Sequence, residues 1–118
     1  MLRLLAMAIV PAFVAACATT TTDCSPRAGF SAALSGERSE PACREDDYGR
    51  AYRLGHTLSE MRAERDALRA EIDELDDDSG RKAARLRARL RVLERDIPEI
   101  EALARLDGLM APATIEPE

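Results

Sequence analysis

The feature that most constrains this chain is a long heptad-patterned stretch, residues 48–106, with one interruption near its middle. Its apolar residues recur at alternating intervals of three and four, which keeps them on one face of a helix. One position of core type is taken by a charged residue, Arg65. The pattern predicts two long helices and an all-α fold. The apolar seam consists of Ala51, Leu54, Leu58, Met61, Leu68, Ile72 and Leu75, followed by Leu86, Leu90, Leu93, Ile97 and Ile100.

Charge changes sign across the interruption. Residues 71–78 carry six acidic side chains and no basic one, whereas residues 81–91 carry six basic side chains and no acidic one. Each block lies at the helix end whose dipole disfavours its charge, and an antiparallel arrangement offsets this by setting the blocks side by side. We therefore expect an antiparallel helical hairpin of coiled-coil type over residues 46–110, with Gly80 as the cap that ends the first helix.

The ends of this helical region carry their own signals. We expect Asp46 or Asp47 to cap the first helix. Pro98 lacks the amide hydrogen that a helix interior uses, so the second helix should kink or restart near Asp96. The tail, residues 111–118, contains two prolines and is expected to be disordered.

Composition limits the size and class of the protein. The chain has 118 residues, no tryptophan and 3% aromatic residues, so there is room for one small domain and little material for a large core. Its formal net charge is −5, and a mildly acidic chain is poorly suited to general nucleic-acid binding. We therefore expect no nucleic-acid partner.

The N-terminus has the pattern of a bacterial export signal. Arg3 precedes an apolar run, residues 4–14, that is too short to span a bilayer and ends in Val14-Ala15-Ala16-Cys17. This ending resembles the lipobox, in which small residues precede the cysteine that receives the lipid. We expect residues 1–16 to be a signal peptide and Cys17 to be lipidated. The alternative is an ordinary secretory signal with an accidental cysteine.

Lipidation would determine where the protein resides. Several acyl chains on Cys17 would anchor it firmly to a membrane, with residues 17–23 as the lipidated cysteine and a polar tether. The residue that follows is Ala18 rather than aspartate. By resemblance to enteric lipoproteins, this favours the outer membrane, with the protein facing the periplasm.

The other two cysteines, Cys24 and Cys43, are expected to form a disulfide. An exported chain folds in an oxidising compartment, where two cysteines left after lipidation of the third are suited to pair. The disulfide would close a loop, residues 24–45, that has few apolar groups to stabilise it. A metal site is the competing interpretation, and it is weak because His56 is the only histidine and no Cys-x-x-Cys pair is present.

Several motifs in residues 24–106 resemble a family of bacterial lipoproteins, the domain of unknown function 2799. They are Cys24-Ser25-Pro26, Gly29-Phe30, a turn at Gly36, Cys43, and the helix-opening run from Tyr48 to Gly55 that contains Ala51-Tyr52. Members of the family carry a further segment before these motifs, whereas Cys24 follows the tether directly here, so the resemblance covers the C-terminal part only. The family has no assigned activity. The resemblance therefore implies an envelope lipoprotein with a helical tail and implies no mechanism.

Tyr48, Tyr52 and Gly55 form a distinctive face near the start of the first helix. The tyrosines are spaced at i and i+4, which places them on one side. A glycine in a helix interior costs about 1 kcal/mol relative to alanine, so it is expected to permit close packing. One interpretation is that the disulfide loop packs Phe30 against this face. The other is a small binding groove.

These observations give two functional hypotheses. The first is a small envelope lipoprotein that presents a coiled-coil hairpin to a protein partner, or associates with itself, along the heptad seam. The second is a ligand-binding module that uses Tyr48, Tyr52, Gly55 and the Cys24–Cys43 loop. An enzyme is not expected, because one histidine and scattered surface acids do not assemble a nucleophile, a base and an orienting group. No cofactor and no metal site are expected.

Overall fold

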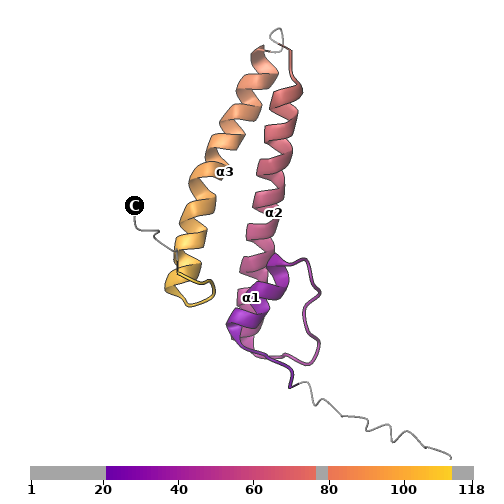
Figure 1. The fold of residues 1–118 in the computed structure, drawn as a ribbon, viewed down its shortest axis with the longest axis vertical. Helices are drawn as coiled ribbons and strands as arrows, with labels where there is room; N and C mark the ends of the chain where they lie inside the picture. Colours follow the sequence, from indigo (N-terminus) through magenta and orange to yellow (C-terminus); the bar gives the residue numbers. More distant parts are fainter. Residues whose placement is uncertain (1–20, 77–79, 113–118) are drawn as a thin grey trace, which may run out of the picture.

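A computed structural model of the protein describes residues 21–76 and 80–112. α2 and α3 lie side by side and run in opposite directions, and α1 packs on the N-terminal half of α2 (Figure 1). The predicted all-α class is confirmed for the described residues. The three helices that these residues form are α1 (Pro26–Leu34), α2 (Asp46–Glu74) and α3 (Gly80–Leu106).

Some predicted features lie outside the described residues. They are the signal peptide at 1–16, the lipidated Cys17 with the first part of its tether, residues 77–79 in the interruption between the two long helices, and most of the tail at 111–118. Within the part of the chain that is described, no helix combines the length and the apolar character that a membrane span requires.

The core is a strip of apolar side chains shared by the three helices. Phe30, Leu58 and Leu93 are the largest side chains that are fully buried, one from each helix. Burying an aliphatic or aromatic side chain of this size contributes about 1.5–3 kcal/mol, so this strip is the main source of stability. Most of the predicted seam residues belong to it, whereas Ile72 and Leu75 are half-buried near the end of α2.

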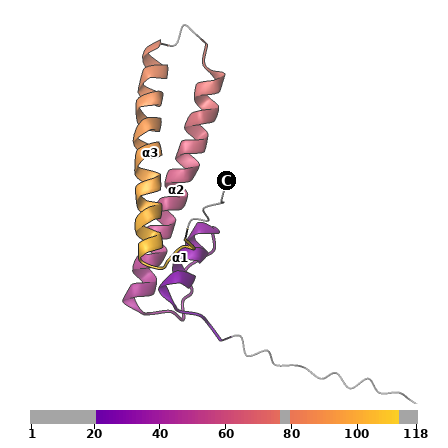
Figure 2. The same ribbon diagram turned by 60° about the vertical axis from the view of Figure 1, so that its left-hand side comes forward.

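Residues 26–34, predicted as part of an irregular loop, form a helix instead. The Ser25 hydroxyl oxygen accepts a hydrogen bond from the Ala28 backbone N–H at 3.1 Å, and Pro26 occupies the first turn, where its missing N–H is not needed. Phe30 and Ala33 are three residues apart and are both buried. The loop prediction is wrong here because one apolar face is enough for a short helix once α2 covers it. Figure 2 shows α1 against the base of α2.

The boundaries of α2 differ from the prediction in their caps. The N-cap residue is Glu45, whose side chain makes no capping hydrogen bond, and Asp46 and Asp47 lie in the first helical turn. Carboxylates there still favour the helix through its dipole, but neither aspartate is a cap. Gly80 is the first residue of α3 rather than the cap of α2, which ends with Leu75 in an extended conformation.

α3 is continuous through Pro98, so the predicted restart near Asp96 is not present. Pro98 is exposed, and its neighbour Ile97 is buried in the core. A missing backbone hydrogen bond at a solvent-facing position is offset by the packing of the opposite face. Tertiary packing therefore carries the helix past the proline.

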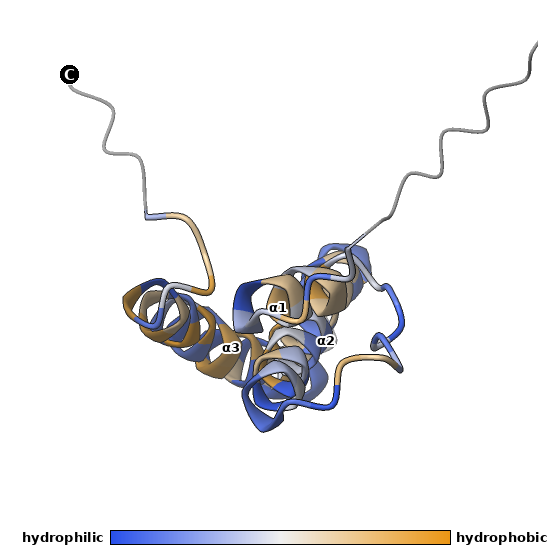
Figure 3. Ribbon diagram, turned by 90° about the horizontal axis from the view of Figure 1, so that it is seen from below, coloured by the Kyte–Doolittle hydropathy of each residue, from blue (hydrophilic) through white to orange (hydrophobic). Residues whose placement is uncertain are grey.

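The chain reverses direction after α3. Gly108 has φ +74°, a conformation that residues with a side chain rarely adopt. The Leu109 N–H donates a hydrogen bond to the Ala104 carbonyl at 2.8 Å, which closes a Schellman motif. Leu109 and Met110 thereby return to the core instead of extending the helix to 110 as predicted. Viewed along the helices, this apolar segment leaves the end of α3 beside α1 (Figure 3).

Candidate functional site

The start of α1 is fastened to the start of α2 by a disulfide. Cys24 and Cys43 are bonded, with their Cα atoms 5.2 Å apart and a sequence separation of 19, which confirms the predicted pair. Closing a loop of this length contributes about 3 kcal/mol on the chain-entropy account. Glu45 lies close to both sulfur atoms, but sulfurs bonded to each other present no thiolate to a metal ion. The pair therefore acts as a clamp on α1.

Two glycines allow α1 to lie directly on α2. A methyl group placed on Gly55 would come within 2.6 Å of the Phe30 carbonyl oxygen and 3.0 Å of the Ala33 side chain. A methyl group on Gly29 would come within 2.8 Å of the Tyr48 carbonyl oxygen. The interior is packed too densely to accommodate such overlaps without movement. Gly55 thus has the close-packing role expected of it, with Phe30 as its neighbour.

Tyr48 and Tyr52 hold the segment that connects α1 to α2. The Tyr48 hydroxyl oxygen accepts a hydrogen bond from the Glu40 backbone N–H at 3.0 Å, and the Tyr52 hydroxyl donates one to the Glu37 carbonyl at 2.6 Å. The two rings stack with their centroids 6.5 Å apart. Both tyrosines therefore fasten residues 35–45 to α2.

The predicted interaction residues come together on one face of α2, and the chain itself covers that face. Tyr48 is buried, and Gly55 lies beneath Phe30 and Ala33. Next to them, His56 is exposed and its ring nitrogen lies 3.2 Å from the Glu60 carboxylate. The space that a ligand would need between α1 and α2 is filled by side chains of α1.

Two shallow pockets border the segment that follows α3. One lies between that segment and α2, with Leu54 and Leu109 in its lining, and the other lies against α1, with Leu34 and Met110 in its lining. Each holds about 230 Å³, whereas pockets that enclose a drug-sized ligand are typically about 300–1,000 Å³. A polar hollow beside Cys43 is lined mainly by charged side chains of the start of α2.

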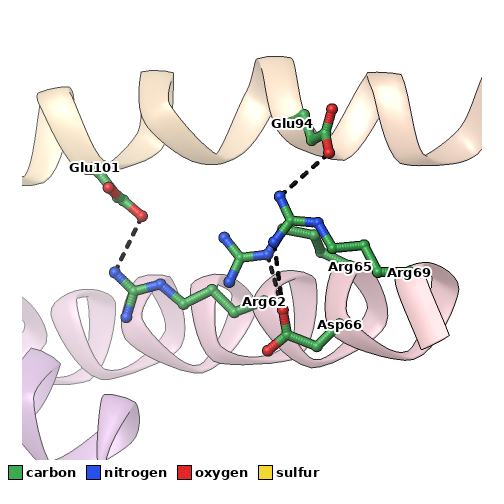
Figure 4. Close-up of polar contacts among 6 residues, drawn as sticks. All are labelled: Arg62, Arg65, Asp66, Arg69, Glu94 and Glu101. Carbon is green, nitrogen blue, oxygen red and sulfur yellow. Dashed lines mark hydrogen bonds and ion pairs between the residues drawn. The ribbon is translucent and has the colours of Figure 1, made fainter.

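Among the described residues, four ion pairs join α2 to α3, two on each side of the seam. On the side that we call the first flank, Arg62 pairs with Glu101 at 3.1 Å and Arg69 pairs with Glu94 at 3.2 Å (Figure 4). The two residues on each helix are seven apart, so each helix uses a single heptad position. On this flank α2 supplies the bases and α3 the acids.

The other side, the second flank, has the opposite charge pattern. Glu64 pairs with Arg89 at 2.7 Å, and Glu71 pairs with Lys82 at 3.3 Å. These residues are also seven apart on each helix, but here α2 supplies the acids and α3 the bases. The expected pairing of the acidic block with the basic block holds for Glu71 and Lys82, whereas Arg89 reaches beyond the acidic block to Glu64.

The ionisation of Glu64 and Arg89 follows from their pairing. Two nitrogens of the Arg89 guanidinium donate hydrogen bonds to the Glu64 carboxylate, and these bonds lower the pKa of Glu64 and raise the pKa of Arg89. The pKa of Asp23 is also lowered, because the Ser25 backbone N–H donates to its carboxylate. All three groups lie at the surface, so the shifts reflect pairing rather than a buried acid–base site.

The cross-helix pairs of the first flank are the feature that sequence reasoning missed. Its signal was present, because Arg62 and Arg69 on one helix, and Glu94 and Glu101 on the other, flank the apolar seam at heptad spacing. Arg65, the charged residue at a core-type position, keeps its guanidinium 3.0 Å from the Asp66 carboxylate, with a quarter of its side chain exposed. Its aliphatic stem can lie along the seam while its charge reaches the surface.

Comparison of the chain with protein-family models, with curated proteins and with solved structures gives no match. The resemblance to the lipoprotein family stays a prediction from the cysteine, glycine and tyrosine motifs. The function has to be inferred from the residues of this chain.

Proposed function

We propose that this protein is a small envelope lipoprotein that presents an antiparallel helical hairpin, of coiled-coil type, to a protein partner. In this proposal Cys17 carries the lipid at the outer membrane and the chain faces the periplasm. α1, held to the start of α2 by the disulfide, forms one end of the molecule, which we call the base. α2 and α3 extend away from this end as the interaction element. The role is binding and needs no catalytic step.

The observation that carries the proposal is the pair of flanks with heptad-spaced ion pairs. Charged residues on both sides of an apolar seam select partner and orientation in coiled coils. The observed register gives four pairs of opposite charge, whereas a slip of one heptad in either direction would give two such pairs and one pair of like charges, Glu64 with Asp96 or Arg69 with Arg87. The charge pattern therefore favours one antiparallel register, which suits α2 and α3 to act as a stiff rod.

The disulfide supports an exported protein. Disulfides persist in oxidising compartments and are rare in the reducing cytosol. The bonded Cys24–Cys43 pair lies just after the segment that resembles a lipobox and its tether. Clamping α1 at this point would hold the base of the rod next to the membrane anchor.

Apolar side chains of α3 that lie outside the seam and are not fully buried support a protein partner. Leu103 is 55% exposed and Leu106 is 83% exposed, and Val92 on the same helix is half-buried. Burial of apolar surface contributes about 25 cal/mol per Å², so a protein that covers these side chains gains stability from the contact. The two exposed leucines lie in the last turns of α3.

Metabolic labelling with palmitate tests the anchor. We expect the wild-type protein to be labelled and the Cys17→Ser variant to be unlabelled. The matched control is Cys24→Ser, which removes a cysteine from the disulfide and should leave the label in place. Equal labelling of Cys17→Ser and the wild type would overturn the lipoprotein part of the proposal.

Photo-crosslinking in intact cells tests the interaction element. A photoreactive amino acid at position 92, on α3, should give a protein adduct of defined mass. The control position is 39, which is exposed in the segment between α1 and α2 and should give little or none. Adducts from position 39 but not from position 92 would place the partner at the base and contradict the proposal.

A further inference from the structure

α1 covers one flank of α2 and leaves the other open. Tyr48, Gly55 and Arg62 follow one another at intervals of seven residues, and Tyr48 and Gly55 contact α1. They therefore continue the first flank toward the start of α2. On the second flank, Arg50 and Thr57 precede Glu64 at the same intervals of seven residues, and both are exposed. In the described part of the chain, the helix contacts are those of α1 with α2 and of α2 with α3. No helix of the described residues therefore covers the second flank.

The second flank contains apolar as well as charged groups. Leu103 occupies the same heptad position of α3 as Lys82 and Arg89, and more than half of its surface is exposed. Met61 and Leu75 are half-buried on the side of the α2 seam next to the acids of this flank. Partly exposed apolar side chains bordered by charges are typical of an interaction surface.

The charges in one half of this flank are separated between the two helices. There its α2 edge carries the acids Glu64 and Glu71, and its α3 edge carries the bases Lys82, Arg85 and Arg89. In the other half the signs are reversed, with Arg50 on α2 and Asp96 and Glu99 on α3. Arg85 makes no ion pair with another described residue. Because the cross-helix pairs fix the register, Arg85 lies at the height of the last two turns of α2, which include Glu71.

We infer that the second flank binds a second copy of this chain, related by a two-fold axis parallel to the helices. A two-fold interface uses the same surface on both copies, so that surface has to be self-complementary. With the axis along the helices, α2 of one copy faces α3 of the other, and Glu71 of each copy meets Arg85 of the other, at the same height on either side of the axis. The product is a four-helix bundle.

The opposite arrangement is disfavoured by the same charges. If the two copies ran head to tail with the halves that contain Glu71 and Arg85 against each other, α2 would face α2 and α3 would face α3. In those halves acids would then lie on the same edge as acids, and bases on the same edge as bases, and like charges at an interface suppress association. The contact between Glu71 and Arg85 therefore needs both copies in the same orientation.

The shared orientation also places the two α1 helices at one end of the bundle. This point rests on the proposed function, because two lipid-anchored chains need their tethers on the same side to leave the same membrane. The separation of charge between the helices carries the inference independently of the anchor.

Mixed charge reversal tests the inference. Full-length chains with two different C-terminal tags are produced together, extracted in mild detergent, and scored for co-purification of one tag with the other. Arg85→Glu paired with itself and Glu71→Arg paired with itself should each lose about tenfold in co-purification, because like charges meet at both symmetry-related contacts. The mixed pair, Arg85→Glu with Glu71→Arg, should recover to within about threefold of the wild type.

The mixed pair separates contacts between copies from effects on folding. It contains the same two variant chains that fail when paired with themselves, so recovery cannot come from improved folding of either. The matched control is Arg91→Glu, the same change at an exposed α3 position that points away from α2, and it should co-purify like the wild type. A mixed pair no better than the two self-pairs would overturn the inference.

A second measurement covers the case in which the variants do not fold. Sedimentation equilibrium of the wild-type chain in detergent should give two chains per complex, and one chain, or a different protein in place of the second copy, would overturn the inference. Palmitate labelling distinguishes the two proposals. A labelled chain that does not pair refutes the dimer alone, and an unlabelled chain that pairs refutes the anchor alone.

Discussion

Arg62 and Glu101 are 39 residues apart in the sequence, yet their side chains meet at 3.1 Å across the seam between α2 and α3. Arg105 lies 3.6 Å from the same carboxylate, so Glu101 faces two guanidinium groups. Only 19% of the Glu101 side chain is exposed, which makes this the most buried of the four described pairs between the helices. It should therefore be the pair that contributes most to their register.

Reversing Arg62 tests this contribution. Arg62→Glu places two carboxylates together and should lower the free energy of unfolding by about 1 kcal/mol, and exchange of both charges, Arg62→Glu with Glu101→Arg, should recover about half of the loss. Urea unfolding followed by circular dichroism measures both. Arg91→Glu is the control, with an expected change within about 0.5 kcal/mol. Losses of the two single variants that simply add in the double variant would show that the pair is not coupled.

Gly55 should be intolerant of even the smallest side chain. The added methyl of Gly55→Ala meets backbone atoms of Phe30, so α1 has to move and we expect a loss of about 1–3 kcal/mol. The matched control in the same helix is Gly49→Ala, whose methyl meets only the flexible Arg53 side chain at 3.4 Å and should stabilise by about 0.5–1 kcal/mol. Amide hydrogen exchange in α1 should accelerate for Gly55→Ala alone. Equal effects of the two substitutions on that exchange would contradict the packing account.

The seam and the disulfide could be predicted from the sequence because each depends on a local or compositional signal. Apolar spacing identifies the buried side of a helix whatever covers it, and Cys24 and Cys43 are the two cysteines that remain once Cys17 is assigned to the lipid. α1 was missed because prolines, glycines and a short length suggest a loop. The Ser25-Pro26 start and Gly36 at its end are helix-boundary signals that were present.

The use of the Tyr48–Gly55 face could not be predicted, because it depends on which segment packs there. The sequence was compatible with a groove or with Phe30, and only the three-dimensional contact decides between them. The ion-pair partners were equally undetermined, since Arg89 has several acids within reach on α2. The chain reverses direction at Gly108 because Leu109 packs against the core. The heptad spacing gives no information about that contact.

Reduction of the disulfide should loosen α1 more than the long helices. Breaking the Cys24–Cys43 bond removes a loop constraint of about 3 kcal/mol, whereas the contacts between α2 and α3 do not involve that loop. Amides of residues 26–34 should exchange faster in the reduced protein, and those around Leu68 and Leu93 should change little. Alkylation without reductant should find neither thiol free. Uniform acceleration across all three helices would contradict a local clamp.

Stability should decline in acid partly through Glu64. Folding lowers the pKa of this carboxylate below its ordinary value of 4.5, so its contribution is complete above that value and is lost as the pH falls through the folded pKa. Glu64→Gln should be less stable than the wild type at neutral pH, and the difference should shrink in acid. Thermal unfolding of both proteins across this range gives the comparison. A difference that is constant with pH would show that the Glu64–Arg89 pair does not stabilise the fold.

The distance between Glu60 and Glu99 tests the antiparallel arrangement of α2 and α3 most directly. Both side chains are exposed, and the cross-helix pairs set these two residues at nearly the same height, so spin labels there should lie within about two helix diameters, roughly 20–25 Å. The labels are attached through non-natural amino acids to keep the disulfide intact, and labelled chains are diluted with unlabelled ones so that only distances within a chain are measured. A continuous helix through the same residues would hold the labels about 58 Å apart at 1.5 Å per residue. A short distance is the predicted result, and a distance near the longer value would contradict the account.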